Sequence, residues 1–405
     1  MKNNPIPAPV FNSSSQIGTG KPILPDPSLC PNPEQCGSCG WSHIPYPKQL
    51  EQKLGDINGS FKIKQLGFRV ERIIPSPLQD HYRNRMDFVI DFQGKVGLRE
   101  KGKWWRVIDN HPCFLADEKI DGLFYKVRNW VTSAGLSFYD RKASSGLLRY
   151  AVIRSSTIGE TMLIVVTSAP SDDTESKMIV TALEQLKTIP ALTTLIWSIN
   201  HTISDVSYGD EERIIFGPGY IAEELLGKLY RISPNAFFQT NPHCAPELIK
   251  VVREFMGDCS DKTVLDLYCG TGLFSIALAS DCKQMIGVEI NETAIKDANI
   301  NAELNNLTNK ITYHASPTEQ FDWLGIGADT VILDPPRSGL HPNTLAEIIG
   351  PKGPNKLIYV SCNYKNLARE LVELKTKYKV AELVAIDMFP HTPHVEVIVK
   401  LERIK

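Results

Sequence analysis

The sequence lacks any hydrophobic run close to the roughly 20 residues that a helix needs to cross a bilayer. Residues 1–29 are rich in Pro, Ser and Asn and have no short apolar core of the kind found in secretory signal peptides. Internal repeats are absent as well. We therefore expect a cytoplasmic chain without a membrane segment, in which residues 1–29 form a flexible arm. The 405 residues, 42% hydrophobic and 22% charged, are typical of a globular protein with two or three cores, and we expect a monomer.

A large net charge is also missing, because the formal value is −2 at pH 7. This sum hides an asymmetry along the chain. Residues 41–150 hold 19 Lys and Arg against 12 Asp and Glu, a balance of +7, and residues 1–40 are neutral, so residues 151–405 carry −9. A basic segment of this kind can hold the phosphate backbone of a nucleic acid. A solvated charged face explains the same charges equally well.

Short apolar runs alternate with helical stretches in the last third of the chain. Helices such as 292–305 and 365–377 separate five expected strands, at residues 264–268, 285–290, 311–314, 330–333 and 357–360. This alternation predicts a Rossmann-like, doubly wound α/β domain with a parallel sheet. Two further strands, 380–387 and 395–401, are expected to form an antiparallel edge. Upstream runs predict a separate α+β domain, and we place the two domains at residues 30–230 and 231–405.

A glycine-containing turn follows the first of these strands. Asp266 lies in the strand, and Gly270 and Gly272 let the backbone approach a ligand closely. Glu289 ends the next strand, where a carboxylate can accept both hydroxyl protons of a ribose. The third glycine of a dinucleotide fingerprint is missing and Asp266 would repel a pyrophosphate, so a cationic nucleoside such as S-adenosyl-L-methionine fits better. A purely structural turn explains the two glycines alone equally well.

Residues that could react follow the last two parallel strands. Asp334 opens an Asp-Pro-Pro-Arg turn whose prolines exclude a helix and aim the carboxylate at the ligand crevice, although a capping Asp in a proline-rich loop is the plainer interpretation. Cys362 ends a strand just before a helix, whose N-terminus would favour the thiolate. A thiolate that adds to carbon 6 of uracil activates carbon 5 toward a methyl donor, and a base must then remove the proton on carbon 5. Glu396, in a Pro- and His-rich turn, is the best candidate for this base.

Five motifs occur in order along the chain. They are Phe-Phe-Gln-Thr-Asn at 237–241, Asp-Leu-Tyr-Cys-Gly at 266–270, Asp-Pro-Pro-Arg at 334–337, Ser-Cys-Asn at 361–363 and His-Thr-Pro-His-Val-Glu at 391–396. From Cys30 to its C-terminus, the chain thereby resembles the RNA 5-methyluridine (uracil-C5) methyltransferase family.

The resemblance implies an RNA (uracil-5-)-methyltransferase with Cys362 as the nucleophile and Glu396 as the base. It also implies a set of contacts to S-adenosyl-L-methionine: Gln239, Tyr268, Glu289 and Asp334, with Gly270 and Gly272 in the turn and Leu273 and Ser316 at neighbouring positions. Two residues depart from the family pattern. Leu273 stands where many relatives have a polar residue, and Tyr364 replaces a frequent proline.

Nine cysteines are an odd number, and in a reducing compartment they are better explained as metal ligands, nucleophiles or small core residues than as disulfides. Cys30, Cys36 and Cys39 form a tight group, and Cys113 follows without a companion. Zinc sites usually draw on two close pairs of ligands, so the pattern favours a 4Fe-4S cluster. The resemblance agrees, because the ribosomal-RNA branch of the family carries such a cluster and transfer-RNA enzymes of bacterial type lack it.

Basic and aromatic residues near these cysteines predict an RNA-binding surface. Residues 82–85 read Tyr-Arg-Asn-Arg, and residues 101–106 contain Trp104 and Trp105 among Lys and Arg. Such side chains can hold phosphates and stack on splayed bases. A core position for both tryptophans is an equally good interpretation.

The expected substrate follows from the length of the N-terminal segment. Only 29 residues precede Cys30, too few for the β-barrel RNA-binding module of many relatives, so the chain resembles the shorter members that act on large-subunit ribosomal RNA. We therefore predict methylation of a uridine in 23S rRNA, in a loop from which the base can be flipped out. The same chemistry on a transfer-RNA loop is one alternative. A non-catalytic RNA-binding assembly factor is another, from a different class of function.

Overall fold

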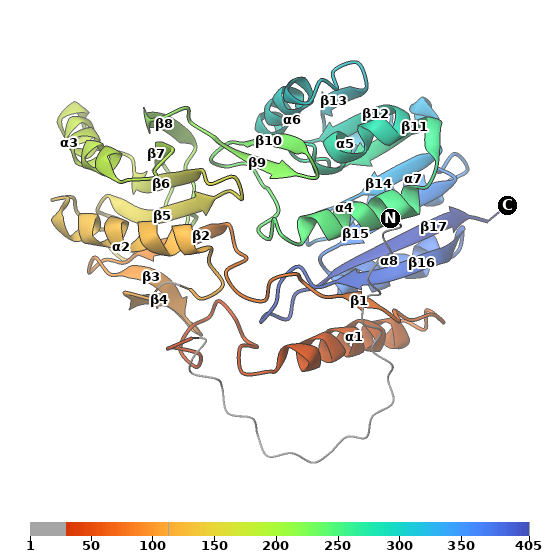
Figure 1. Ribbon diagram of the computed structural model, residues 1–405, viewed down its shortest axis with the longest axis horizontal. Coiled ribbons are helices and arrows are strands. Elements are labelled where there is room, and N and C mark those ends of the chain that lie inside the picture. Colours follow the sequence, from red (N-terminus) through yellow and green to blue (C-terminus); the bar gives the residue numbers. More distant parts are fainter. Residues whose placement is uncertain (1–29, 112, 405) are drawn as a thin grey trace, which may run out of the picture.

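The computed structural model describes residues 30–111 and 113–404, and the predicted arm at residues 1–29 lies outside this range. Two sheets dominate the described residues, one of eight strands and one of seven, and a two-stranded hairpin lies between them (Figure 1). No helix in this part of the chain is both long and apolar enough to span a bilayer.

The eight-stranded sheet contains the five strands predicted for the doubly wound domain. They run parallel in the order β15 (Lys356–Ser361), β14 (Thr330–Leu333), β11 (Cys259–Leu267), β12 (Cys282–Glu289) and β13 (Ile311–Ala315). The predicted terminal pair is confirmed, because β17 (Glu396–Arg403) runs antiparallel to both β15 and β16 (Tyr378–Ile386). The prediction that this pair forms the edge of the sheet is wrong. The short strand β1 (Ile73–Ile74) pairs in parallel with β16 and covers that edge.

Helices cover both faces of this sheet, as a doubly wound fold requires (Figure 1). α4 (Ala245–Met256), α5 (Leu273–Leu278) and α6 (Glu292–Leu304) lie on one face, and α1 (Tyr46–Ile63), α7 (Pro342–Ile349) and α8 (Tyr364–Leu374) lie on the other. Strand β14 shows why both faces are apolar: Ile332 packs with the first group of helices, whereas Val331 and Leu333 pack with the second. Because these strands are buried on both faces, their sequences are the continuous hydrophobic runs described above.

The seven-stranded sheet is mostly antiparallel. Its order is β4 (Lys103–Asp109), β3 (Val96–Glu100), β2 (Arg85–Ile90), β5 (Leu148–Ser155), β6 (Thr161–Ser168), β7 (Thr194–Asn200) and β8 (Glu211–Phe216). α2 (Glu118–Ser133) and α3 (Asp173–Glu184) pack on one face. The remaining short helical turns are Gln185–Thr188, Ala279–Asp281, Thr318–Gln320 and Leu324–Ile326.

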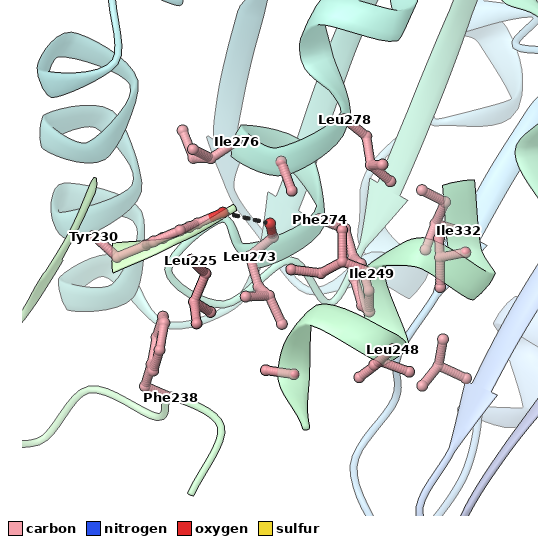
Figure 2. Packing of buried hydrophobic residues seen from close by; sticks show 14 of the residues in the cluster. Leu225, Tyr230, Phe238, Leu248, Ile249, Leu273, Phe274, Ile276, Leu278 and Ile332 are labelled. Atoms are coloured by element: carbon pink, nitrogen blue, oxygen red, sulfur yellow. Dashed lines mark hydrogen bonds between the residues drawn. The ribbon is translucent and has the colours of Figure 1, made fainter. Parts of the chain in front are cut away.

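The other face of this sheet shares a core with the doubly wound domain. One apolar cluster runs from Val152 and Ile164 of the seven-stranded sheet, through the hairpin of β9 (Ile221–Leu225) and β10 (Lys228–Ile232), to α4 and α5. Figure 2 shows Leu225, Tyr230 and Phe238 gathered against α5, where the Tyr230 hydroxyl donates to the carbonyl of Leu273 at 3.1 Å. The two sheets are therefore held by a common core.

The N-terminal helix departs from the predicted division of the chain. Ile57 and Phe61 of α1 belong to the cluster formed by β14, β15, α7 and α8, and β1 pairs within the catalytic sheet. Residues 46–74 therefore pack on the doubly wound domain, although the predicted first domain spans residues 30–230. The boundary between residues 230 and 231 stays a prediction.

Replacing Leu225 with Ala should destabilise the whole molecule. The side chain is 2% exposed in the shared core, and truncation of a buried leucine costs about 2–5 kcal/mol. We expect equilibrium urea unfolding to show this loss in one transition, because the core belongs to both sheets. Leu226→Ala is the matched control, since its neighbouring side chain is 41% exposed. Equal stabilities of the two variants would contradict the shared core.

Candidate active site

Strand pairing brings Cys362 and Glu396 together. In the antiparallel register of β15 and β17, Ser361 lies opposite Val397. The next residue after Ser361 is Cys362 and the one before Val397 is Glu396, so these two also come opposite each other. Glu396 is only 5% exposed, and Cys362 is partly buried. The predicted nucleophile and base thus meet at the carboxyl end of the parallel strands.

Negative charge and burial determine the proton affinities at this point. Burial, and then the nearby Asp334, raise the pKa of Glu396 to about 8, while Arg337 opposes the shift. Burial, Glu396 and Asp334 raise the pKa of Cys362 to about 11. One carboxylate oxygen of Glu396, Oε2, is buried without a hydrogen-bond partner among the described residues. Both groups therefore hold their protons to a higher pH than an exposed carboxyl group or thiol does.

The expectation that the helix N-terminus favours a Cys362 thiolate is wrong for the free protein. Asn363 caps α8, and its side chain accepts from the backbone N–H groups of Lys365 and Asn366 at 3.2 and 3.4 Å. The cap occupies two of the free N–H groups at the start of α8. The two carboxyl groups beside Cys362 act in the opposite direction from a helix N-terminus.

The glycine-containing turn lies beside a carboxylate at the carboxyl end of the sheet. Tyr268, Gly270 and Gly272 have positive φ angles of 66°, 54° and 88°. Glu289 accepts from the backbone N–H groups of Gly270 and Asn291 at 3.2 and 2.9 Å, which fixes its carboxylate at the end of β12. The backbone N–H of Ser316 donates to the carbonyl of Glu289 at 2.9 Å, so Ser316 lies beside it.

Asp266 and Asp334 add two acidic groups at the same end of the sheet. Asp266 is fully buried and accepts from the Ser275 backbone N–H at 2.9 Å, while its Oδ1 has no partner among the described residues. Burial raises the pKa of Asp266 to about 7, and Glu289 adds to this shift. Burial and the neighbouring Asp266 raise the pKa of Asp334 to about 7 as well. Such a crowded set of acids favours a cationic ligand.

The remaining predicted cofactor contacts have different surroundings. Gln239 is 7% exposed, and its carbonyl accepts from the Asn84 amide at 3.2 Å, which ties the motif at 237–241 to the seven-stranded sheet. The Leu273 side chain lies in the shared core, so only its backbone is near the turn (Figure 2). Tyr268 lines a cavity of about 510 Å³ that α7 and α8 border. Contact of these residues with a cofactor stays a prediction.

Residues that the sequence reasoning missed hold the loop before Glu396. Lys53 of α1 pairs with Asp387 at 2.6 Å, with both side chains fully buried, and donates to the Phe389 carbonyl at 3.0 Å. The Gln49 side chain accepts from the His391 backbone N–H at 2.7 Å. One signal could have revealed Lys53: it shares the apolar stripe of α1 with Leu50, Ile57 and Phe61. A lysine in such a stripe needs a buried partner.

The four predicted cluster cysteines are all buried. Cys36, Cys39 and Cys113 share one core, and the Cys30 sulfur lies 3.6 Å from the His111 ring. Burial raises the pKa of Cys39 to about 11 and that of Cys113 to about 12. The described residues contain no group of three or more His, Cys, Asp or Glu side chains that could hold a metal ion. The geometry therefore does not support the predicted cluster as a preformed ion site.

Replacing Glu396 with Gln should change how stability depends on pH. The carboxyl titrates near pH 8 in the folded protein, against an ordinary value of 4.5. The folded state therefore holds the extra proton between these values, and its stability falls as the pH rises through this window. Glutamine does not titrate, so the variant should gain stability relative to the wild type as the pH increases from 4.5 to 8. Urea unfolding without cofactor at several pH values measures this difference, and a difference that stays constant would contradict the raised pKa.

Comparisons with known proteins agree with this geometry. A family described as tRNA (uracil-5-)-methyltransferase matches residues 182–404. The tRNA (uracil(54)-C(5))-methyltransferase of Pyrococcus horikoshii is 38% identical over 91% of this chain and 84% of its own length. An uncharacterized RNA methyltransferase of Clostridium tetani is 37% identical over 92% of this chain and 83% of its own.

A solved structure is similar over the same length. The crystal structure of Pyrococcus abyssi tRNA (uracil-54, C5)-methyltransferase in complex with S-adenosyl-L-homocysteine has a TM-score of 0.76 and 34% identity, and the match covers 90% of this chain and 86% of that one. The α/β fold is therefore that of an S-adenosylmethionine-dependent methyltransferase. The chain belongs to the RNA 5-methyluridine (uracil-C5) methyltransferase family.

Proposed function

We propose that this enzyme methylates carbon 5 of a uridine in transfer RNA. The observation that carries the chemistry is the pairing of β15 with β17, which sets Cys362 opposite Glu396 beside Asp334. The relatives named for uracil-54 of tRNA support the target, because they are 34–38% identical over about nine-tenths of this chain. They favour the transfer-RNA alternative over our prediction of 23S rRNA. Family membership excludes the interpretation of the chain as a mere assembly factor.

Cys362 and Glu396 divide the reaction between them. Cys362 and Glu396 first release their protons to solvent. The Cys362 sulfur then forms a bond to carbon 6 of the uracil, and the ring electrons move to carbon 5 and the carbonyl at carbon 4. S-adenosylmethionine supplies the methyl group when bound. Glu396 then removes the proton from carbon 5, the bond from sulfur to carbon 6 breaks, and the thiolate is regenerated. Glu396 suits this role because a carboxylate whose pKa lies near 8 is a stronger base than an ordinary one.

The acidic groups near the glycine-containing turn favour the binding of a cation. Asp266 and Asp334 lie near the glycine-containing turn, and a positively charged ligand beside them lowers the pKa values that burial and then neighbouring carboxylates have raised. The charge of Asp334 contributes to the raised pKa of the Cys362 thiol, so a cationic ligand beside Asp334 makes this thiol easier to ionise. Binding of the methyl donor thereby activates the nucleophile.

Variants at the two residues test this mechanism. Cys362→Ala should abolish methyl transfer to RNA, because no sulfur remains to add to carbon 6. Glu396→Gln should let a covalent complex with RNA accumulate, seen as a band that survives denaturing electrophoresis, because the adduct cannot lose its proton. Cys282→Ala, at a buried thiol outside the crevice, is the control and should retain activity. Normal turnover by Cys362→Ala would refute the proposal.

The choice of RNA needs its own control in the same assay. Unmodified transfer RNA and 23S rRNA are offered separately to the wild type with labelled methyl donor, and we expect label in the transfer RNA only. Mapping the labelled nucleotide as 5-methyluridine confirms the position on the ring. Label confined to 23S rRNA would restore our first prediction and overturn the transfer-RNA target, while leaving the mechanism intact.

We also propose that the four N-terminal cysteines bind a 4Fe-4S cluster. Burial of all four, and the mutual electrostatic influence of Cys36, Cys39 and Cys113, support the proposal. The spacing of three close cysteines and one distant one suits a cluster better than the two close pairs that are usual for zinc.

Anaerobically purified protein should therefore contain iron and acid-labile sulfide in equal amounts. Cys113→Ser should lower both, whereas Cys244→Ser, at a buried thiol on α4 of the other domain, should leave them unchanged. Elemental analysis together with sulfide determination measures both quantities. Protein that contains zinc, or no metal at all, would overturn the proposal.

A further inference from the structure

A second cleft lies at the edge of the seven-stranded sheet, apart from the catalytic crevice. Its volume is about 340 Å³, and strands β2, β3, β4 and β5, the segment 139–142 and Asp205 contribute to its wall. Apolar and aromatic residues alternate with charged ones around it; the residues that the argument uses are Val89, Arg99, Trp104, Tyr139, Arg141 and Asp205. Nothing in the proposed chemistry uses this cleft.

Two exposed tryptophans form one wall. Trp104 and Trp105 of β4 are 50% and 51% exposed, which excludes a core position for them. Their rings meet edge to face with centroids 5.7 Å apart, and the Arg141 guanidinium lies 4.5 Å from the Trp104 ring centroid. Large aromatic side chains left in solvent beside a cleft indicate a binding surface. A ring with a cation on it is a platform on which a nucleobase can stack.

Four cationic side chains and three acidic ones line the cleft, which leaves a small positive balance. Arg99 and Arg141 both pair with Asp205, at 2.6 and 2.7 Å, and Lys142 is exposed beside them. The other two acids of the lining are turned toward the backbone: Asp91 accepts from the N–H groups of residues 93 and 95, and Asp140 accepts from that of residue 142. Asp205 is thus the one lining carboxylate that pairs with the lining cations. The remaining positive charge suits a phosphate.

The arginines are held in place before any ligand arrives. The Arg149 guanidinium lies 4.3 Å from the Tyr139 ring centroid and donates to the Thr202 carbonyl at 2.8 Å. Arg99 also donates to the Tyr150 hydroxyl at 2.9 Å. Side chains fixed in this way lose little conformational freedom on binding, so their contacts with a ligand add more to affinity.

The cleft lies next to the core that the two sheets share. Val89 and Tyr150 line the cleft and also belong to the core shared by both sheets, and Val107 packs against that core. Helices α2 and α3 cover the opposite face. An RNA bound across the domain junction therefore meets this cleft without passing around the sheet.

We infer that the cleft binds an unpaired nucleotide of the substrate RNA, with the base stacked on Trp104 and the adjacent phosphate held by Arg141 and Lys142. The inference rests on the proposed function, because it takes the substrate to be RNA. Interleaved aromatic and basic side chains recognise single-stranded RNA in this way, whereas a peptide would not need a base-sized aromatic wall with cations beside it.

Variants of Trp104 test the inference through RNA binding. Stacking of one base contributes about 1–3 kcal/mol, so Trp104→Ala should weaken the binding of unmodified transfer RNA about 5- to 150-fold in fluorescence anisotropy. Trp104→Phe keeps an aromatic face and should restore most of the affinity. Tyr125→Ala removes an aromatic residue that is 44% exposed on α2, on the opposite face, and should bind like the wild type.

Kinetics separate this role from a structural one. Trp104→Ala should raise KM for transfer RNA and leave kcat and the affinity for S-adenosyl-L-homocysteine unchanged, because the cleft touches no reacting atom. Wild-type affinity for transfer RNA in Trp104→Ala, or no rescue by Trp104→Phe, would overturn the inference. Binding is measured without catalysis, so a failure of methyl transfer in the wild type would count against the proposed function alone.

Discussion

The site depends on one pairing, the antiparallel contact of β17 with β15 inside an otherwise parallel sheet. β15 ends at the carboxyl edge, where a doubly wound fold collects its ligands, and β17 begins there because it runs in the opposite direction. Cys362, the residue that follows β15, therefore meets Glu396, the first residue of β17. A parallel β17 would place Glu396 at the far end of the sheet. The reversal of one strand is what brings a second reacting group to the edge.

This arrangement requires that the turn before β17 be held from outside the sheet. Residues 387–395 form a proline- and histidine-rich turn, and His391 has a positive φ angle of 64°. Lys53 and Gln49 of α1 bond to it from one side, while the Tyr82 hydroxyl donates to the Pro390 carbonyl at 3.0 Å from the first domain. A buried ion pair contributes little net stability once desolvation is counted, but it accepts only one geometry. The packing of α1 on the catalytic sheet thus positions the base.

Much of the fold could be predicted from the sequence because strands buried on both faces leave continuous apolar runs. Asp334 and Cys362 were found for the same reason, since each directly follows such a run. Local sequence patterns could not predict that Cys362 lies opposite Glu396, because this contact depends on the register of β15 and β17. The state of Cys362 was predicted wrongly from its place before a helix. Asn363 caps that helix, and burial of the thiol, together with Glu396 and Asp334, raises the pKa of Cys362.

The substrate was harder to predict than the chemistry, for a physical reason. Adding a thiolate to uracil needs a sulfur, a base and a methyl donor within one crevice, and these leave short motifs. Choosing one RNA over another depends on surfaces such as the cleft at Trp104, whose residues come from β2, β3, β4 and β5, from the segment 139–142 and from the loop that carries Asp205. The short segment 101–106 indicated only its two tryptophans, because the rest of the lining is distant in the sequence. A rigid core shared by the two sheets is what gives such a distant surface a fixed position relative to Cys362, so that RNA bound at one can be aligned at the other.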